Sequence, residues 1–200
     1  MRRSIIFFVL LLTVINLEAR IRRLTAKEKA VLRQKLVATA LSYKGRKGID
    51  CSGFIRKVML RNNITIFEKQ SIRRRGDNGV KIIFNTLRKY HKIFRSYKKV
   101  KPGDLIFFDN TYDKNHNRLY DDRLTHIGMV LSVDKAGTIK FIHSTGKGII
   151  ISFLNIRYRH KYRDRNGKVI NSFLRRKSRR DSHRVKYLAG ELVSYFGTIF

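Results

Sequence analysis

Apolar residues recur at helical spacing in the first half of the chain and in short strand-like runs in the second half. Thr25 and Glu28 form the signature of a capping box, and the apolar positions after them predict a helix over residues 26–42. A second apolar helical face begins just after Cys51. A third follows a glycine-containing turn, and its apolar positions over residues 82–94 predict another helix.

Short runs rich in β-branched and aromatic residues dominate the second half, and Gly or Asp separates them. They occupy residues 105–108, 126–131, 139–143 and 149–151. This pattern predicts an antiparallel meander. Farther along, we expect a hairpin turn at residues 165–168 and a closing strand or helix over residues 187–200. Helices followed by strands indicate an α+β fold.

The composition is that of one folded domain, over residues 20–200, rather than a disordered polycation. Of 200 residues, 42% are hydrophobic, which is enough to bury a core. Lys and Arg number 46 against 14 Asp and Glu, so the formal net charge is +32. Basic stretches are interpreted as an insertion over about residues 61–99 and a C-terminal extension over about residues 155–200. One Cys, one Pro and no Trp exclude collagen-like repeats, a disulfide framework and a multi-cysteine zinc module.

The N-terminus has the features of a secretory signal peptide over residues 1–19. Two arginines follow Met1, and an apolar run extends from residue 5 to residue 15. That run is shorter than the roughly 20 apolar residues of a membrane span, and cleavage is expected after Ala19. We therefore expect export to the periplasm, the cell envelope or the extracellular medium. An uncleaved segment would anchor the protein in the membrane, and a buried N-terminal helix or strand is the other alternative.

Export restricts the roles open to the single cysteine, Cys51. It can be buried and inert, paired with another molecule, or a reactive nucleophile. Asp50 is placed to cap the predicted helix, which puts Cys51 on the first turn. Backbone N–H groups and the helix dipole at that position favour the thiolate and can form an oxyanion hole. This placement favours a nucleophile over an inert core residue.

Two histidines on predicted strands are candidates for the base. His126 begins one strand and His143 ends the next. Because a turn joins these antiparallel strands, both positions lie at the same end of the sheet, where the imidazoles can pair as base and orienting residue. A single histidine on a strand would more often be structural. A nucleophile, a base and an orienting group are the parts that a cysteine peptidase needs.

Four motifs, in order within residues 36–155, resemble those of the NlpC-type family of papain-like bacterial cysteine peptidases, which act on the cell wall. They are Asp-Cys-Ser-Gly-Phe at residues 50–54, Gly-Asp-Leu-Ile-Phe-Phe at 103–108, His-Ile-Gly-Met-Val at 126–130 and Phe-Ile-His at 141–143. The resemblance implies a papain-like α+β fold. In that fold, N-terminal helices pack on an antiparallel sheet and the nucleophilic cysteine starts one of the helices.

The resemblance also implies a role for each matching residue. The catalytic roles fall on Cys51 as nucleophile, His126 as general base and His143 as orienting residue. A tyrosine upstream of the cysteine often supplies an oxyanion contact in the family, and Tyr43 is the candidate here. Asp50 and Ser52, on either side of the cysteine, are assigned to the same oxyanion and substrate-binding region.

The family's activity indicates the reaction to expect. Its members hydrolyse amide bonds in peptidoglycan stem peptides, typically between γ-D-glutamate and the diamino acid. Thiolate attack would give a thioester acyl-enzyme, which water then hydrolyses, so no cofactor is required. CHAP-type amidases share the order of cysteine and histidine, which makes such an amidase one alternative. A catalytically silent protein of the same fold that binds the wall or another polyanion is a second.

The loop before His126 is locally acidic in a strongly basic chain. Its residues Asp113, Asn115, Asn117 and Asp121 match the first, third, fifth and ninth positions of a calcium loop of the EF-hand type. Arg118 stands where that pattern needs Gly, and Leu124 stands where it needs Glu. Asx-rich turns explain such a loop without a metal, so a weak structural calcium site is one hypothesis of two.

The positive charge predicts attraction to polyanions, in addition to peptidoglycan peptides as substrate. For an exported protein these are anionic cell-wall polymers, lipid head groups and extracellular DNA. Basic and aromatic residues alternate over residues 156–162. No phosphate-binding glycine loop, zinc spacing or RNA-binding signature accompanies them, which disfavours nucleic acid. A solvated basic face without a partner is the alternative, and we expect a monomer.

Overall fold

The structure is a computed structural model that describes residues 24–65, 77–117, 119–179 and 181–200. Its helices are α2 (Ala26–Leu41), α3 (Cys51–Arg61), α4 (Gly79–Lys89) and the short α5 (Ala189–Leu192), with a 3-10 turn at Tyr97–Lys99. Its strands are β1 (Ile93–Phe94), β2 (Leu105–Phe108), β3 (His126–Val133), β4 (Ile139–Thr145), β5 (Gly148–Leu154) and β6 (Val193–Gly197). The α+β fold class is confirmed. The predicted signal peptide over residues 1–19 lies outside the described residues.

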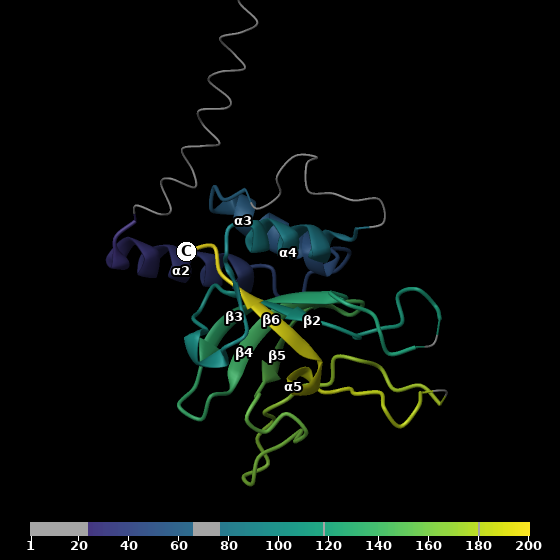
Figure 1. The fold of residues 1–200 in the computed structure, drawn as a ribbon. Helices are drawn as coiled ribbons and strands as arrows, with labels where there is room; N and C mark the ends of the chain where they lie inside the picture. The colour runs from purple at the N-terminus through teal and green to yellow at the C-terminus, as the bar shows by residue number, and fades with distance from the viewer. Residues whose placement is uncertain (1–23, 66–76, 118, 180) are drawn as a thin grey trace, which may run out of the picture.

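In the part of the chain that the structure describes, the strands form one antiparallel sheet in the order β1-β6-β2-β3-β4-β5. The predicted meander is confirmed as β2 to β5, in which each strand pairs with the next along the chain. β6 comes from the end of the chain and inserts between β1 and β2, so Phe196 pairs with Phe94 on one side and Ile106 on the other. Figure 1 shows β6 in yellow, beside β2 near the middle of the molecule.

Two hydrophobic cores lie on the two faces of the sheet. Helices α2, α3 and α4 lie together over one face (Figure 1). Successive residues of a strand point to opposite faces, so Leu105 and Phe107 of β2 join the core under these helices. Ile106 and Phe108 join the second core, which includes Leu192 of α5. β2 is therefore buried on both faces, which explains its unbroken apolar sequence.

The third predicted helix ends earlier than expected. α4 ends at Lys89 with Tyr90 as its C-cap, and His91 then takes a left-handed backbone conformation with φ 55°. Phe94, predicted to continue the apolar helix face, lies on β1 instead, where its ring stacks on Phe196 with centroids 5.8 Å apart. The prediction of a helix to residue 94 was wrong, because apolar periodicity does not register a local backbone reversal.

Three further expectations of local structure are confirmed. The capping box at Thr25 and the helix after it are confirmed. The turn at residues 165–168 is present, and Asp164 Oδ1 accepts hydrogen bonds from backbone N–H groups inside it. Residues 187–200 supply both a short helix, α5, and a strand, β6.

Within the described residues, no helix combines the length and the apolar character needed to cross a membrane.

Candidate active site

Helix α3 begins at the cysteine. Asp50 is the N-cap, and its Oδ1 accepts hydrogen bonds from the backbone N–H of Gly53 at 2.6 Å and from Ser52 Oγ at 2.8 Å. First-turn N–H groups have no partner within a helix, so such a cap stabilises the helix start by about 1 kcal/mol. The prediction that Asp50 caps the helix and that Cys51 lies on its first turn is confirmed.

Cys51 lines a cleft of about 560 Å³ at one end of the sheet. His126, at the start of β3, and His143, near the end of β4, line the same cleft. The structure therefore brings these three residues together, as expected for neighbouring antiparallel strands. Ser144 and Thr145 of β4 also line it, and the other lining residues belong to the connections around the strands and helices: Gly48, Ile49, Asp50, Thr111, Tyr112, Thr125, Gly146 and Leu174.

A chain of hydrogen bonds leads from His126 into the sheet. Its Nε2 lies 2.7 Å from Nδ1 of His143, and Nε2 of His143 lies 2.9 Å from Oγ of Ser152 on β5. His143 and Ser152 are only 2% and 3% exposed, so water does not compete for these bonds. The ring of Phe141 packs on His143 with centroids 5.0 Å apart, which restricts the imidazole plane.

This series of hydrogen bonds uses Nε2 of His126 and leaves Nδ1 available to a reacting group. When Nε2–H of His126 donates to His143, and Nε2–H of His143 donates to Ser152, Nδ1 of His126 keeps a free lone pair. The reverse set of donors would place a proton on Nδ1 of His126 and remove the base. With Ser152 as the acceptor, every donor of this hydrogen-bond chain has a partner in the tautomer in which His126 can take a proton.

Sequence reasoning missed Ser152. The only signal is one polar residue within the apolar run of β5. Its meaning depends on the strand register, which pairs Ser152 with Phe141 and leaves His143 as its diagonal neighbour on the same face. A register cannot be read from these short runs, so the contact with His143 becomes evident only in the fold.

Burial sets the protonation of the cysteine and both histidines. It raises the pKa of the Cys51 thiol to about 11, although backbone N–H groups, first that of Ile127, act to lower it. Burial lowers the pKa of His126 to about 4 and holds the pKa of His143 well below its usual range. These directions favour a neutral thiol beside neutral imidazoles at rest. They act against the expected thiolate, because desolvation outweighs the N–H groups of the helix start.

Tyr43 is not brought to the cleft. It is 4% exposed in the core under the helices, where its ring meets Phe54 edge-on with centroids 6.0 Å apart. Tyr112, which sequence reasoning missed, lines the cleft and is 49% exposed. Burial raises the pKa of Tyr112, and negative charge on Cys51 raises it further. Tyr112 follows the apolar run of β2 within a polar loop, and that position gave no sign of its function.

Ser52 does not itself line the cleft, although its hydroxyl bonds Asp50, which does. Besides its bond to Asp50, it faces Gly79, the first residue of α4. A Cβ atom at Gly79 would lie 2.7 Å from the Cβ of Ser52 and closer still to its Oγ. Ser52 therefore sits where the starts of α3 and α4 meet, and it acts on the position of Cys51 through the helix.

The acidic loop is held by its own hydrogen bonds. Nδ2 of Asn117 donates to the two carboxylate oxygens of Asp121 at 3.4 and 3.2 Å, and the backbone N–H of Asn117 donates to Oδ1 of Asn115 at 3.1 Å. Among the described residues, no group of three or more His, Cys, Asp or Glu could hold a metal ion. A calcium ion at Asp113, Asn115, Asn117 and Asp121 would require the Asn117 amide to turn around.

The calcium site stays a prediction, and calorimetry tests it. Titration with calcium should release heat and raise the thermal midpoint, while magnesium should do neither. An Asp121→Asn variant should lose the calcium response, because a carboxylate ligand is removed. Absence of heat up to about 10 mM calcium, beyond the weakest extracellular calcium modules, would contradict the prediction.

A cysteine at a helix start that shares a cleft with a histidine pair at the end of an antiparallel sheet is the arrangement of a papain-like cysteine peptidase. Residues 39–167 match the model of the NlpC/P60 family. Since the match covers more than half of the chain, the protein belongs to the NlpC/P60 family, whose members are cysteine peptidases of the cell wall. The predicted family and the papain-like fold are thereby confirmed. No curated protein matches the chain.

Proposed function

We propose that the protein is an exported cysteine hydrolase that cleaves amide bonds in peptidoglycan stem peptides. The proposed bond joins γ-D-glutamate to the diamino acid, the typical target of the matching family. One observation carries the proposal: Cys51 lines the same cleft as His126, whose Nε2 is held 2.7 Å from His143. An inert cysteine has no need of an imidazole oriented in this way.

In the acylation step, Sγ of Cys51 attacks the substrate carbonyl while its proton passes to Nδ1 of His126. Because the resting pair is neutral, the proton moves during the attack rather than before it. The backbone N–H of Cys51, on the first turn of α3, can donate to the developing oxyanion. Tyr112 replaces Tyr43 as the candidate for a second contact there, since Tyr112 lines the cleft. The imidazolium then gives its proton to the leaving amine, the C–N bond breaks, and a thioester remains.

Hydrolysis of the thioester uses the same base. His126 accepts a proton from water as the water oxygen attacks the thioester carbonyl. The C–S bond then breaks, the acid product leaves, and the proton returns to sulfur. His143 and Ser152 hold the imidazole plane through both steps, so Nδ1 of His126 faces the reacting atoms each time.

Mass spectrometry of purified muropeptides incubated with the protein tests the proposal. The expected products have lost the diamino acid and every residue after it, and D-glutamate carries the new carboxyl group. Cys51→Ala should form no product. Cys51→Ser is the matched variant that keeps a hydroxyl at the same place, and it should fall by several orders of magnitude because an alcohol is a far weaker nucleophile.

The other outcomes separate the alternatives. Cleavage of a different amide bond, abolished by Cys51→Ala, would retain the hydrolase and assign the specificity of a CHAP-type amidase. Unchanged muropeptides, with the protein folded, would contradict hydrolysis and favour a silent protein that binds the wall. Product formed equally by Cys51→Ala would exclude the cysteine mechanism altogether.

A further inference from the structure

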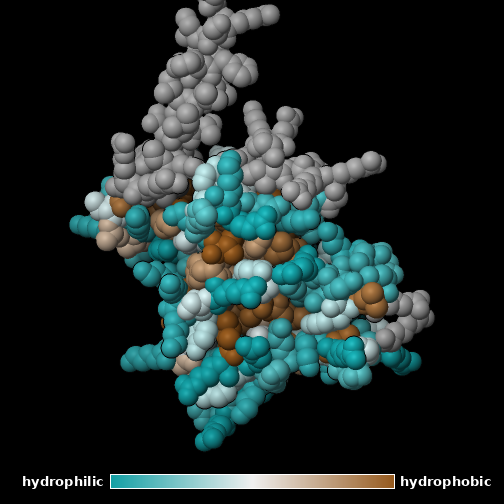
Figure 2. Space-filling model, viewed as in Figure 1, coloured by the Kyte–Doolittle hydropathy of each residue, from teal (hydrophilic) through white to brown (hydrophobic). Residues whose placement is uncertain are grey.

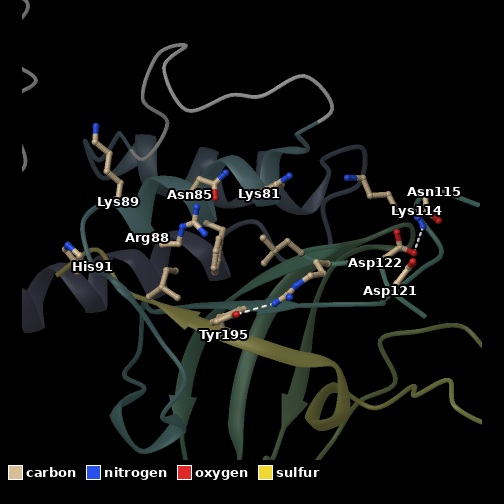
Figure 3. A pocket seen from close by; sticks show the side chains of 14 residues that line it. Lys81, Asn85, Arg88, Lys89, His91, Lys114, Asn115, Asp121, Asp122 and Tyr195 are labelled. Carbon is tan, nitrogen blue, oxygen red and sulfur yellow. Dashed lines mark hydrogen bonds between the residues drawn. The ribbon is translucent and has the colours of Figure 1, made fainter. Parts of the chain in front are cut away.

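A second, larger cavity lies on the other side of the loop that precedes β3. It is a groove of about 1200 Å³ between α4 and that loop, with β6 beneath it (Figure 3). Figure 2 shows hydrophobic atoms in the hollow between the helices and the sheet, surrounded by hydrophilic side chains. The lining residues are Lys81, Phe84, Asn85, Arg88, Lys89, His91, Ile93, Lys114, Asn115, Asp121, Asp122, Arg123, Leu124 and Tyr195.

The walls of this groove are cationic. Five Lys or Arg residues line it against two Asp residues, and both carboxylates already accept hydrogen bonds within the loop. Asp122 accepts from the backbone N–H of Lys114 at 3.0 Å, and Asp121 accepts from the side chain of Asn117. The side chains of Arg88, Lys114 and Arg123 are exposed. Lys81 is paired with Asp77 at 2.8 Å, so the net positive charge that the groove presents to a ligand rests mainly on Arg88, Lys114 and Arg123.

Two guanidinium groups converge beside the floor of the groove. The hydroxyl of Tyr195 accepts a hydrogen bond from Arg95 at 2.8 Å and another from Arg123 at 3.2 Å. These interactions lower the pKa of Tyr195. Asp109 approaches Arg123 only to 3.8 Å, and the Arg123 side chain is 67% exposed. Two like charges gathered around a neutral phenol are stabilised by an anion that bridges them, and a phosphate oxygen suits a guanidinium particularly well.

The aromatic rings of the groove are already covered. Phe84 is 7% exposed, and its ring packs against Phe107 and Tyr195 with centroids 5.3 and 5.0 Å away. The guanidinium of Arg95 lies over the ring of Tyr195, 4.7 Å from its centroid. A nucleic acid bound without base pairing depends on free aromatic faces on which bases stack. This groove provides charge without a stacking surface, which favours an anionic polymer that has no bases.

We propose that the groove binds a linear polymer of phosphodiester-linked polyol units. Residues 81 to 89 of α4 extend along about 12 Å of helix, enough for more than one phosphate group. The loop that carries Lys114 and Arg123 also carries Thr111 and Tyr112, which line the cleft of Cys51. The polymer would therefore lie beside the cleft and hold the protein at an anionic cell wall. This binding goes beyond the proposed hydrolysis and does not require it.

The test measures binding of a fluorescein-labelled poly(glycerol phosphate) oligomer to the Cys51→Ala protein, so a failure of hydrolysis cannot affect the result. The groove variant replaces Arg88, Lys114 and Arg123 with Ser. The matched control replaces three exposed cations elsewhere, Lys135, Lys161 and Arg165, with Ser and has the same net charge. Thermal unfolding of each protein checks the fold, and the single variant Lys114→Ser replaces the triple variant if the triple variant does not fold.

At 150 mM salt the groove variant should bind at least tenfold more weakly, and the control should change less than twofold. The slope of log affinity against log salt should fall by about 2 in the groove variant, because about 0.7 is lost per phosphate contact. Equal weakening in both triple variants would overturn the proposal and leave only a general attraction by net charge. A thymidine oligonucleotide of equal charge that binds as tightly would also overturn it, since the base-free chemistry would be wrong.

Discussion

Ser152 ends the hydrogen-bond chain that holds His126, the proposed base, and lies 2.9 Å from Nε2 of His143. Ser152→Ala removes the acceptor, so His143 no longer has a reason to keep its proton on Nε2. The tautomer of His126 with a free Nδ1 is then less populated, and we expect kcat to fall about tenfold with KM nearly unchanged. Muropeptide kinetics measure both constants.

A spectroscopic signature separates this positioning role from a merely structural one. Nitrogen NMR of the imidazoles should show His126 protonated at Nε2 in the native protein and partly at Nδ1 in Ser152→Ala. Ser152→Thr keeps the hydroxyl and should recover most of the activity. A loss of kcat without any change in the tautomer would contradict the role assigned to Ser152.

His126 and His143 also make the fold sensitive to acid. Burial lowers the pKa of His126 to about 4 and that of His143 well below its usual value. The unfolded chain therefore binds protons near pH 6.5, whereas the folded chain does not. By linkage, the free energy of unfolding falls as the pH drops from about 6.5 toward 4, by about 1.4 kcal/mol per pH unit for each histidine. Urea titrations at pH 7 and pH 5 measure this loss.

The control removes the titrating groups. His126→Gln with His143→Gln should unfold at nearly the same urea concentration at both pH values, whatever its stability at pH 7. The resonances of His126 and His143 in the native protein should also show no titration midpoint between pH 8 and pH 5. A titration midpoint near 6.5 in the folded protein would contradict the assigned burial.

At the scale of elements, the starts of α3 and α4 meet at Ser52 and Gly79. A Cβ at position 79 would lie 2.7 Å from the Cβ of Ser52, a distance at which one helix has to move. We expect Gly79→Ala to lower the free energy of unfolding by about 1–3 kcal/mol, as overpacking does. Because Cys51 adjoins Ser52, the displacement should also reduce activity. Chemical denaturation and muropeptide kinetics measure the two effects.

A second substitution tests the cause. Ser52→Gly removes the side chain that the added methyl group at position 79 would meet. The double variant Ser52→Gly with Gly79→Ala should therefore recover most of the loss, a non-additive result typical of residues in contact. Gly146→Ala is the control for stability alone, because a Cβ there meets no atom within 4 Å but Gly146 lines the cleft. If Gly79→Ala alone is as stable as Gly146→Ala, the contact between the helix starts is looser than the structure indicates.

The elements that sequence could predict are those with local signals. The capping box at Thr25, the Asp50 cap and the apolar runs of β2 to β5 are all specified within a few residues. The place of β6 between β1 and β2 is not, because a short C-terminal strand has no local mark of its partners. The left-handed residue His91, just after α4, could not be predicted either, because the local sequence has no mark of it.

The residues of the site can also be separated into those with a local sequence signal and those without one. Sequence order and strand ends were sufficient to predict that Cys51, His126 and His143 would meet. Whether Tyr43 or Tyr112 reaches the cleft depends on how the loop before β3 folds, and no spacing rule encodes that. The thiol pKa depends on how many neighbours exclude water, a property of the packed structure rather than of the helix start.

At the scale of the whole molecule, the strong positive charge and the expected export are explained together by anionic partners outside the cytoplasm. A formal charge of +32 gives a field that acts over about a Debye length, roughly 8 Å at physiological salt. Such a protein in the cytoplasm would meet nucleic acid everywhere, whereas outside it meets anionic wall polymers and lipid head groups. Burial is the first cause of the shifted pKa values of Cys51, His126 and His143, and no Lys or Arg is among their causes. We therefore expect the positive charge to act on where the protein binds rather than on the reacting groups.

Export itself is testable with the N-terminal segment alone. Residues 1–25 fused to a β-lactamase that lacks its own signal should confer ampicillin resistance, because the enzyme protects only from outside the cytoplasm. Replacing Leu10 and Leu11 with Arg breaks the apolar run and should abolish resistance. The mass of the exported fusion then distinguishes cleavage after Ala19 from an uncleaved anchor. Equal resistance from both fusions would contradict the signal peptide, and resistance from neither would place the protein inside the cell, where its charge would need a different partner.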